Sequence, residues 1–262
     1  MSGATMSEAS EVLVSRDGAI ATLTINRPRA KNSLNRAVFD GLRAQLVQLR
    51  DDDTVRAVII TGAEGVFCAG ADIGAWGPMA PFDFARLWVR EGHRIFDRLA
   101  RLGKPTIAAL NGHAFGGGLE LAACCDIRVI TPKAALALPE AGIGIVPGWS
   151  GTQRVARLLP EAVVKEMALF GRRIGAERAL ALGFVAEVAE DVGAAARAIA
   201  ERAVNLSPRA VEVAKYMIQA GVGEDRAALI EALGSGMIAA SADRAEGVGA
   251  FAEKRKPVFS GR

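Results

Sequence analysis

The apolar residues of the first hundred positions recur with different spacings, and each spacing predicts one kind of element. In residues 19–26, Ile and Leu alternate with Thr, which is the period of a half-buried strand. Residues 36–50 and 83–102 repeat apolar side chains every three or four positions, as an amphipathic helix does. Continuous apolar runs at 56–62 and 105–110 predict buried strands. Because strands and helices alternate, we expect an α/β fold of stacked units.

The chain from about residue 161 has a different texture, rich in Ala, Glu and Arg at helical spacing. Helices are predicted there at residues 161–170, 176–182, 192–205, 208–220, 224–240 and 243–254. Their many apolar positions predict that this part either covers the core or packs on another subunit. We therefore expect an α/β core in residues 1–200 and a helical oligomerisation region in residues 201–262, with no low-complexity linker between them.

Composition narrows the class of protein. Of the 262 residues, 51% are hydrophobic, which is enough for a substantial core. The 32 basic and 29 acidic side chains leave a net charge of only +3, and a single Tyr with scattered Phe makes no aromatic and basic stripe, so we expect no nucleic-acid partner. The longest apolar stretch, residues 106–125, is interrupted by Asn111, His113 and Glu120, which argues against a membrane span.

Cysteine usage and the N-terminus predict a cytoplasmic location. Cys68, Cys124 and Cys125 form neither a CxxC pair nor a disulfide framework. Residues 1–14 alternate small, polar and acidic side chains and lack the basic start and apolar run of a signal peptide. A reducing compartment fits both observations.

Two carboxylates lie in otherwise apolar segments of the chain. Glu120 ends a run of three glycines and a leucine, and Glu140 follows Leu138 and Pro139. Removing a carboxylate from water costs several kcal/mol unless it is paired, hydrogen-bonded or protonated. Catalytic chemistry is a reason for a chain to keep two of them.

Two loops of small residues each follow a predicted buried strand. The glycines at 116–118 precede an apolar segment, 119–125, that suits a short helix, and the N–H groups at a helix start favour a phosphate or an oxyanion. The loop at 67–73 also lets a ligand approach the backbone. If the N–H groups of Ala71 and Gly117 converge, they make an oxyanion hole for a carbonyl. Taken alone, the glycines are explained equally by tight strand–helix packing, and the second loop more simply by a structural role.

Other signals for chemistry are weak. The segment 142–148 is one residue too long for a dinucleotide fingerprint and contains Pro147. The segment 148–152 resembles a nucleophile elbow but lacks the closing glycine. With only His93 and His113, a histidine-based triad or metal site has little material, and we expect no metal.

With these residues in place, the chain resembles the crotonase, or enoyl-CoA hydratase/isomerase, superfamily over nearly its whole length. The resemblance is carried by residues 25–28, 32–35, 67–73, 111–121, 125–128, 139–148, 151–154 and 246–256. It implies a crotonase-like spiral of stacked ββα units with a C-terminal helical region. It also implies an acyl-CoA substrate, no cofactor beyond that coenzyme A, and a homotrimer or a dimer of trimers.

Carried over by position, the resemblance implies that the N–H groups of Ala71 and Gly117 hold the thioester oxygen of the acyl-CoA. Glu120 and Glu140 then share one water, in a reversible syn addition to a trans-2-enoyl-CoA that gives a 3-hydroxyacyl-CoA. A double-bond isomerase can work with one carboxylate, so the presence of two favours hydration. We expect Glu120 to take the proton from water and Glu140 to deliver one to the α-carbon.

The same resemblance places coenzyme A and the acyl chain. Phosphates are expected on the basic side chains, and pantetheine and adenine on the loop around Ala71, while Trp149 can shorten or reshape the acyl pocket. The expected contacts are Arg27, Arg29, Lys31, Ala69, Gly70, Asp72, Ile73, Gly148, Trp149 and Lys254.

Two alternatives stay open at this point. An isomerase or another acyl-CoA dehydratase would use the same fold. From a different class, a non-catalytic CoA-binding or RNA-binding member would keep the fold as an assembly module. Retention of both glutamates argues against a non-catalytic protein, and the near-neutral charge argues against RNA.

Overall fold

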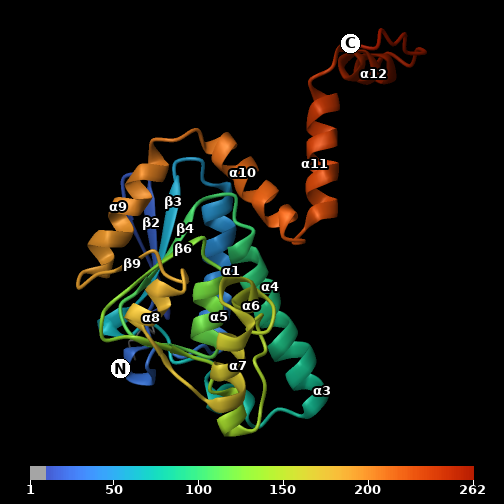
Figure 1. Cartoon of the computed structure of the whole chain (residues 1–262). Helices are drawn as coiled ribbons and strands as arrows, with labels where there is room; N and C mark the ends of the chain where they lie inside the picture. Colours follow the sequence, from blue (N-terminus) through green and yellow to red (C-terminus); the bar gives the residue numbers. More distant parts are fainter. Residues whose placement is uncertain (1–9) are drawn as a thin grey trace, which may run out of the picture. The chain divides into compact units, whose positions relative to one another are not determined.

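A computed structural model describes residues 10–262. The prediction that residues 1–14 are not a signal peptide therefore falls mostly outside the described residues. The main sheet has six strands in the order β1-β2-β3-β4-β6-β9, and Figure 1 labels β2, β3, β4, β6 and β9. The pair β1 and β2 is antiparallel, and the remaining neighbours are parallel. The strand bounds are β1 (Val12–Asp17), β2 (Ile20–Ile25), β3 (Ala57–Gly62), β4 (Thr106–Leu110), β6 (Ile127–Ile130) and β9 (Glu187–Val188).

Side chains of β3 alternate between the two faces of this sheet, which explains why the strand reads as a continuous apolar run. Val58 and Ile60 belong to the larger core, on the face covered by α1 (Arg36–Asp51), α4 (Arg90–Ala100) and α5 (Gly117–Ala123). Ala57 and Ile59 belong to a smaller cluster with residues of α9 (Val192–Val204), which covers the opposite face. The sheet is therefore buried on both sides.

A second, three-stranded sheet supports the glycine-rich segment. Its order is β5 (Ala114–Phe115), β7 (Ala135–Ala137) and β8 (Ile174–Gly175), with β5 parallel to β7. An isolated parallel bridge between Cys68 and Ala114 ties the small-residue loop to this sheet. The two loops that follow β3 and β4 are thus held side by side.

The helices agree in outline with the sequence prediction. The helix expected at 83–102 begins with a π-helical turn, η3 (Phe84–Val89), before α4. The short helix expected at 119–125 begins two residues earlier, at Gly117. The remaining helical segments of this part are η1 (Pro28–Ala30), η2 (Ala63–Gly65), α2 (Ile73–Trp76), α3 (Pro81–Asp83), η4 (Glu140–Ile143), α6 (Arg154–Leu158), α7 (Glu161–Phe170) and α8 (Ala176–Ala181).

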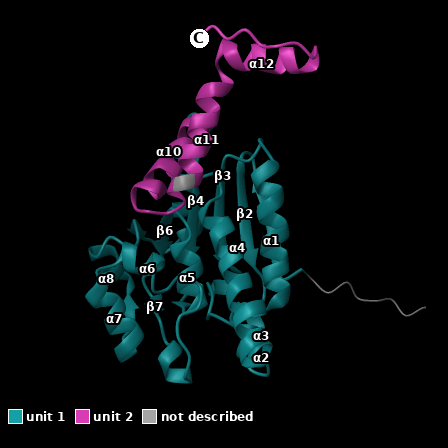
Figure 2. Cartoon of the chain, turned by 90° about the vertical axis from the view of Figure 1, so that its right-hand side faces the viewer, with its two compact units in different colours: residues 1–208 teal, residues 209–262 magenta. Residues whose placement is uncertain are grey.

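The chain divides into two compact units, Met1–Pro208 and Arg209–Arg262 (Figure 2). The second unit holds most of α10 (Pro208–Gly221), together with α11 (Arg226–Ala239) and α12 (Ala242–Ala252). No described side chain of α11 is buried. The large apolar side chains exposed in α11, α12 and the tail are Ile230, Leu233, Met237, Ile238, Val248, Phe251, Val258 and Phe259. Throughout the described chain, no helix combines the length and apolarity needed to cross a membrane.

Candidate active site

Both glutamates and both small-residue loops line one cavity of about 660 Å³ in the first unit. Gly116, Gly117 and Glu120 enter it from the start of α5, and Glu140 enters from the start of η4. The rest of the wall is mainly apolar and comes from α2, η3, α4 and the segment 143–149. Residues that the sequence places far apart therefore meet at one site.

The backbone at Ala71 is oriented by a parallel bridge to Leu34. Leu34 N–H donates to the Gly70 carbonyl at 2.8 Å, and Asp72 N–H donates to the Leu34 carbonyl at 2.8 Å. In this pairing the neighbours of Ala71 bond to Leu34, so the N–H of Ala71 points to the other side, away from Leu34. No described residue accepts a hydrogen bond from it.

Gly117 is the first residue of α5, where a helix leaves its N–H groups without intrahelical acceptors. The two loops are in close contact here, because a Cβ added to Gly70 would lie 3.5 Å from the Gly117 nitrogen. Both Ala71 and Gly117 line the cavity. The structure therefore brings together the two amides that the sequence predicts as an oxyanion hole.

Each glycine of the run 116–118 is excluded from carrying a side chain for a different reason. Gly116 has a φ of 50°, and a Cβ there would lie 2.7 Å from Glu140 Oε1. A Cβ on Gly117 would lie 2.5 Å from the Trp149 ring, and one on Gly118 would overlap the carbonyl of Cys68. The same glycines therefore allow tight packing against Glu140, Trp149 and Cys68 and leave the backbone N–H at the start of α5 accessible.

Glu120 is almost completely buried, with 1% of its surface exposed. Its Oε1 accepts two backbone hydrogen bonds, from Trp149 N–H at 2.7 Å and from Gly151 N–H at 2.6 Å. Burial raises the pKa of this carboxyl to about 7, the two amides oppose that rise, and the nearby Glu140 adds to it. A carboxyl with a pKa near neutrality can both accept and release a proton under physiological conditions.

Glu140 is also buried, with 7% of its surface exposed, and burial raises its pKa as well. Its Oε2 has no hydrogen-bond partner among the described residues. A buried carboxylate oxygen without a donor is unfavourable, whereas a protonated carboxyl avoids most of that penalty. The surroundings therefore favour the acid form of Glu140.

Trp149 is buried and forms the floor of the cavity beside the glutamates. Its ring packs on Phe39 with centroids 5.1 Å apart, on Trp88 at 5.6 Å and on Phe96 at 5.4 Å. Gly92 on α4 makes room for it, since a Cβ there would overlap the indole. The predicted role of Trp149 as a wall of the pocket agrees with this position, and Gly148 lines the cavity next to it.

Sequence reasoning missed a polar network behind this wall. Ser150 is buried with a φ of 88°, and its Oγ accepts a hydrogen bond from Arg154 Nη1 at 3.3 Å. Arg154 Nη2 pairs with Asp97 Oδ1 at 2.6 Å, and His93 Nδ1 lies 3.4 Å from Ser150 Oγ. The sequence predicted Gly148 and Trp149 as substrate contacts, but it did not predict that the amides of Trp149 and Gly151 hold Glu120.

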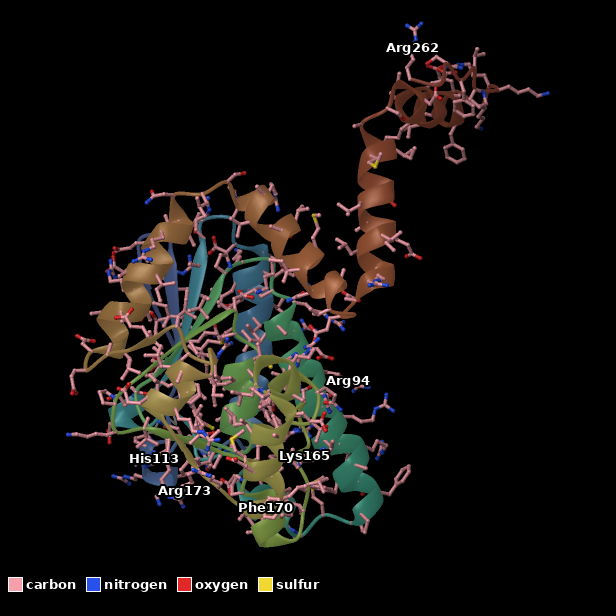
Figure 3. The ribbon with its side chains drawn as sticks, viewed as in Figure 1. Arg94, His113, Lys165, Phe170, Arg173 and Arg262 are labelled. Atoms are coloured by element: carbon pink, nitrogen blue, oxygen red, sulfur yellow. The ribbon has the colours of Figure 1, made fainter. Side chains whose placement is uncertain are left out.

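His113, in contrast, is part of the framework (Figure 3). Its Nδ1 accepts the Ala135 N–H at 2.9 Å, and its ring stacks on Phe115 with centroids 5.0 Å apart. The Arg173 guanidinium lies 5.0 Å from the same Phe115 ring. His113 thereby links β5 to the start of β7.

Arg27, one of the expected phosphate contacts, is engaged with two carboxylates. Its guanidinium pairs with Glu11 at 3.1 Å and with Asp72 Oδ2 at 2.9 Å. Asp72 Oδ1 also accepts the Gly74 N–H at 3.1 Å and so caps α2. In this arrangement Arg27 and Asp72 fix the loop that carries Ala71, and their contact with coenzyme A stays a prediction.

The other expected coenzyme A residues occupy two regions. Arg29 and Lys31 are exposed in and after η1, and the Lys31 carbonyl accepts the Ala69 N–H at 3.0 Å, so the basic turn adjoins the small-residue loop. Ala69, Gly70 and Ile73 line the cavity. Lys254 is exposed in the second unit, after α12. Within the described chain, no group of three or more His, Cys, Asp or Glu side chains is arranged to hold a metal ion.

Comparison with known proteins adds to this geometry. The family model for enoyl-CoA hydratase/isomerase matches residues 15–262. The short-chain-enoyl-CoA hydratase of Clostridium acetobutylicum is 37% identical over 254 residues, covering 95% of this chain and 97% of that protein. The 2,3-dehydroadipyl-CoA hydratase of Escherichia coli is 36% identical, covering 97% and 100%. The solved enoyl-CoA hydratase of Bacillus anthracis has a TM-score of 0.79 at 34% identity, covering 96% and 100%.

Proposed function

Because this chain belongs to the enoyl-CoA hydratase/isomerase family and is an enoyl-CoA hydratase with the predicted crotonase-like fold, we propose roles for its residues in adding water to a trans-2-enoyl-CoA. The single observation that carries the assignment is the meeting of Glu120, Glu140, Ala71 and Gly117 in one cavity. Hydration needs two groups that transfer protons and two donors that bind the thioester oxygen, and these four residues supply them.

The amides of Ala71 and Gly117 hold the thioester oxygen of the substrate. Negative charge develops on that oxygen as water adds to the β-carbon and an enolate forms. Two fixed donors, one of them at the positive end of α5, stabilise this charge more than they stabilise the neutral thioester. The helix begins at Gly117, which supports this role.

Glu120 acts as the base. Its Oε1 is held by two amides, which stabilise the carboxylate and leave Oε2 for the attacking water. The carboxylate takes one proton from the water, and the remaining hydroxide bonds to the β-carbon.

Glu140 acts as the acid and gives its proton to the α-carbon as the enolate collapses. Both changes occur on the side of the substrate that faces the two glutamates, which gives syn addition. The water supplies the hydroxyl group, and the proton gained by Glu120 balances the one lost by Glu140. The cycle closes when a proton returns from Glu120 to Glu140, and every step runs in reverse for dehydration.

Coenzyme A binding and assembly are further parts of the proposal. Arg29 and Lys31 are exposed beside the loop of Ala69 and so can meet the phosphates. Arg27 and Lys254 stay contacts that only the family resemblance implies. The apolar side chains exposed in the second unit support a homotrimer or a pair of trimers. We keep a cytoplasmic location as part of the same proposal.

The roles are tested by following the loss of the conjugated thioester absorbance of crotonyl-CoA and longer enoyl-CoAs. Glu120→Gln and Glu140→Gln should each lower kcat by at least about 100-fold, the usual contribution of a general acid or base. The matched control is Glu177→Gln, on an exposed side chain of α8, which should keep full activity. Near-normal activity of either active-site variant would refute its role.

A second measurement separates hydration from isomerisation. When a 3-enoyl-CoA is supplied, mass spectrometry detects a product that has gained one water, and a rise in the conjugated thioester absorbance detects isomerisation, which leaves the mass unchanged. We expect hydrated product from 2-enoyl-CoA and little conversion of the 3-enoyl isomer. The reverse pattern would favour an isomerase.

A further inference from the structure

Besides the two glutamates, the described lining of the cavity contains one further ionisable side chain. His93, on α4, lines it together with Trp88 and Val89 from the preceding turn. Among the described residues that line the cavity, none is Lys or Arg, and the acidic ones are Glu120 and Glu140. His93 thus supplies the wall with hydrogen-bonding capacity that the hydration chemistry does not use.

The network behind the wall assigns the tautomer of His93. Ser150 Oγ accepts a hydrogen bond from Arg154, and Arg154 in turn pairs with Asp97. The Ser150 hydroxyl hydrogen then has one described acceptor within reach, His93 Nδ1 at 3.4 Å. Because Nδ1 accepts, the ring hydrogen of a neutral imidazole sits on Nε2.

The groups around His93 keep the imidazole neutral. Burial lowers its pKa, the Arg154 guanidinium lowers it further, and Asp97, one turn along α4, opposes both. The other ionisable residues that line the cavity are Glu120 and Glu140. Since Nδ1 faces buried Ser150, the Nε2–H lies on the other side of the ring, where no described residue accepts its hydrogen bond.

We propose that His93 determines acyl-group specificity, and that the preferred substrate carries a neutral oxygen in its acyl chain beyond the β-carbon, which accepts the hydrogen bond of His93 Nε2–H. The inference rests on the proposed function, because it places the acyl chain of a CoA thioester in this cavity. The loop of Ser150 also supplies the two amides that hold Glu120, so His93 stands beyond the reacting carbons.

The chemistry of the wall favours a neutral oxygen over a carboxylate. An acyl carboxylate would be desolvated among Trp88, Val89 and Trp149 with a neutral imidazole as its donor and no lining cation. It would also share the cavity with Glu120, which repels it whenever that carboxyl is ionised. A hydroxyl, ether or ketone oxygen carries neither penalty and can accept the hydrogen bond of His93 Nε2–H.

The test uses saturated thioesters, so that binding is measured without turnover. Three matched pairs replace one methylene by oxygen: 4-methoxybutanoyl-CoA with hexanoyl-CoA, 5-methoxypentanoyl-CoA with heptanoyl-CoA, and 6-methoxyhexanoyl-CoA with octanoyl-CoA. Calorimetry gives the Kd of each for the wild type, His93→Phe and His93→Gln. The ether is an acceptor only, so it reports on a donor in the wall.

For at least one pair, the ratio of ether to alkyl affinity should be about fivefold higher in the wild type than in His93→Phe, the usual net effect of one hydrogen bond. His93→Gln keeps a neutral donor and should retain part of the preference. Adipoyl-CoA should bind the wild type more weakly than heptanoyl-CoA.

Equal ratios in the wild type and His93→Phe for all three pairs would overturn the inference while leaving the acyl-CoA site intact. Tighter binding of adipoyl-CoA than of heptanoyl-CoA would overturn the choice of a neutral oxygen. Failure of every thioester to bind would instead contradict the proposed function, and the inference would fall with it.

Discussion

Glu120 shows how one side chain can be both strongly buried and usable as a base. Burial removes the water that would stabilise its charge, and the raised pKa of about 7 records that loss. The N–H groups of Trp149 and Gly151 both donate to Oε1 and so partly stabilise the charged form of the carboxylate. The result is a carboxyl that is neither permanently charged nor permanently neutral at physiological pH.

The raised pKa of Glu120 has a consequence for stability. The carboxyl has an ordinary pKa of 4.5, which we take for the unfolded chain, and a pKa of about 7 in the folded protein. Between these values the native state binds more protons, so the free energy of unfolding falls as pH rises from about 5 to about 8. Glu120→Gln does not titrate and keeps an oxygen for both amides. We expect the variant to become more stable relative to wild type between pH 5 and pH 8, by about 2–3 kcal/mol.

Urea unfolding at both pH values and at one protein concentration measures this effect. Glu177→Gln, on the surface of α8, controls for the amide substitution itself and should show no such change. If the stability difference between Glu120→Gln and wild type is the same at pH 5 and pH 8, the carboxyl does not titrate in this range.

At the scale of single residues, sequence reasoning reached the groups that stand in unusual surroundings. Glu120 and Glu140 are charged residues in apolar runs, and such a conflict is visible without a structure. Ser150 and His93 are ordinary polar residues in ordinary segments, and their importance comes from a contact across 57 positions. Nothing local in the sequence marks that contact.

The element that organises the site is α5, a helix of seven residues that begins inside the glycine run. Its first turn presents Gly117 to the cavity and also carries Glu120, so one short helix sets both an amide donor and the base. The helix lies close to the Cys68 backbone because Gly118 has no side chain. A change at this contact should therefore move both groups together.

Gly118→Ala tests the contact between α5 and the small-residue loop. The added Cβ would overlap the Cys68 carbonyl and lie 2.9 Å from Cys68 Cβ, and backbone cannot move aside as a flexible side chain can. We expect a loss of about 2–3 kcal/mol in the free energy of unfolding and a fall in kcat as the oxyanion donors shift. The same substitution at Gly142, where a Cβ meets no atom within 4 Å, should leave stability within about 0.5 kcal/mol. Comparable stability of the two variants would show that α5 does not need this close approach.

Long elements were predictable and short ones were not, for a physical reason. The helix at 36–50 and the strand at 56–62 contain enough residues for their periods to be read, and both are present as α1 and β3. The strands β5, β8 and β9 have two residues each, which is too few to show a period. They exist because neighbouring backbone offers hydrogen bonds, and that information is not local.

At the scale of the whole molecule, the sequence predicted the family fold because the repeated alternation of strand and helix, and the motifs in their loops, extend along nearly the entire chain. The texture change after residue 161 correctly indicated helices. The sequence does not identify the surface that covers these helices. Apolar residues on all sides of a helix predict that it is buried, but they do not specify what it packs against. For α11, with no described side chain buried, we propose that the partner is another copy of this chain.

This assembly is tested by the mass of the particle in solution. Light scattering should give three or six times the 27.4 kDa mass of the chain. Met237 and Phe251 are 76% and 87% exposed in the second unit, and burying such side chains stabilises an interface by about 1.5–3 kcal/mol each. The double variant Met237→Asp/Phe251→Asp would place two charges in that interface and should lower the mass of the particle.

Phe82→Asp, a matched substitution at a side chain that is 76% exposed in the first unit, should leave the mass of the particle unchanged. A wild-type protein that runs at the mass of one chain at micromolar concentration would contradict the proposed trimer, whatever its activity.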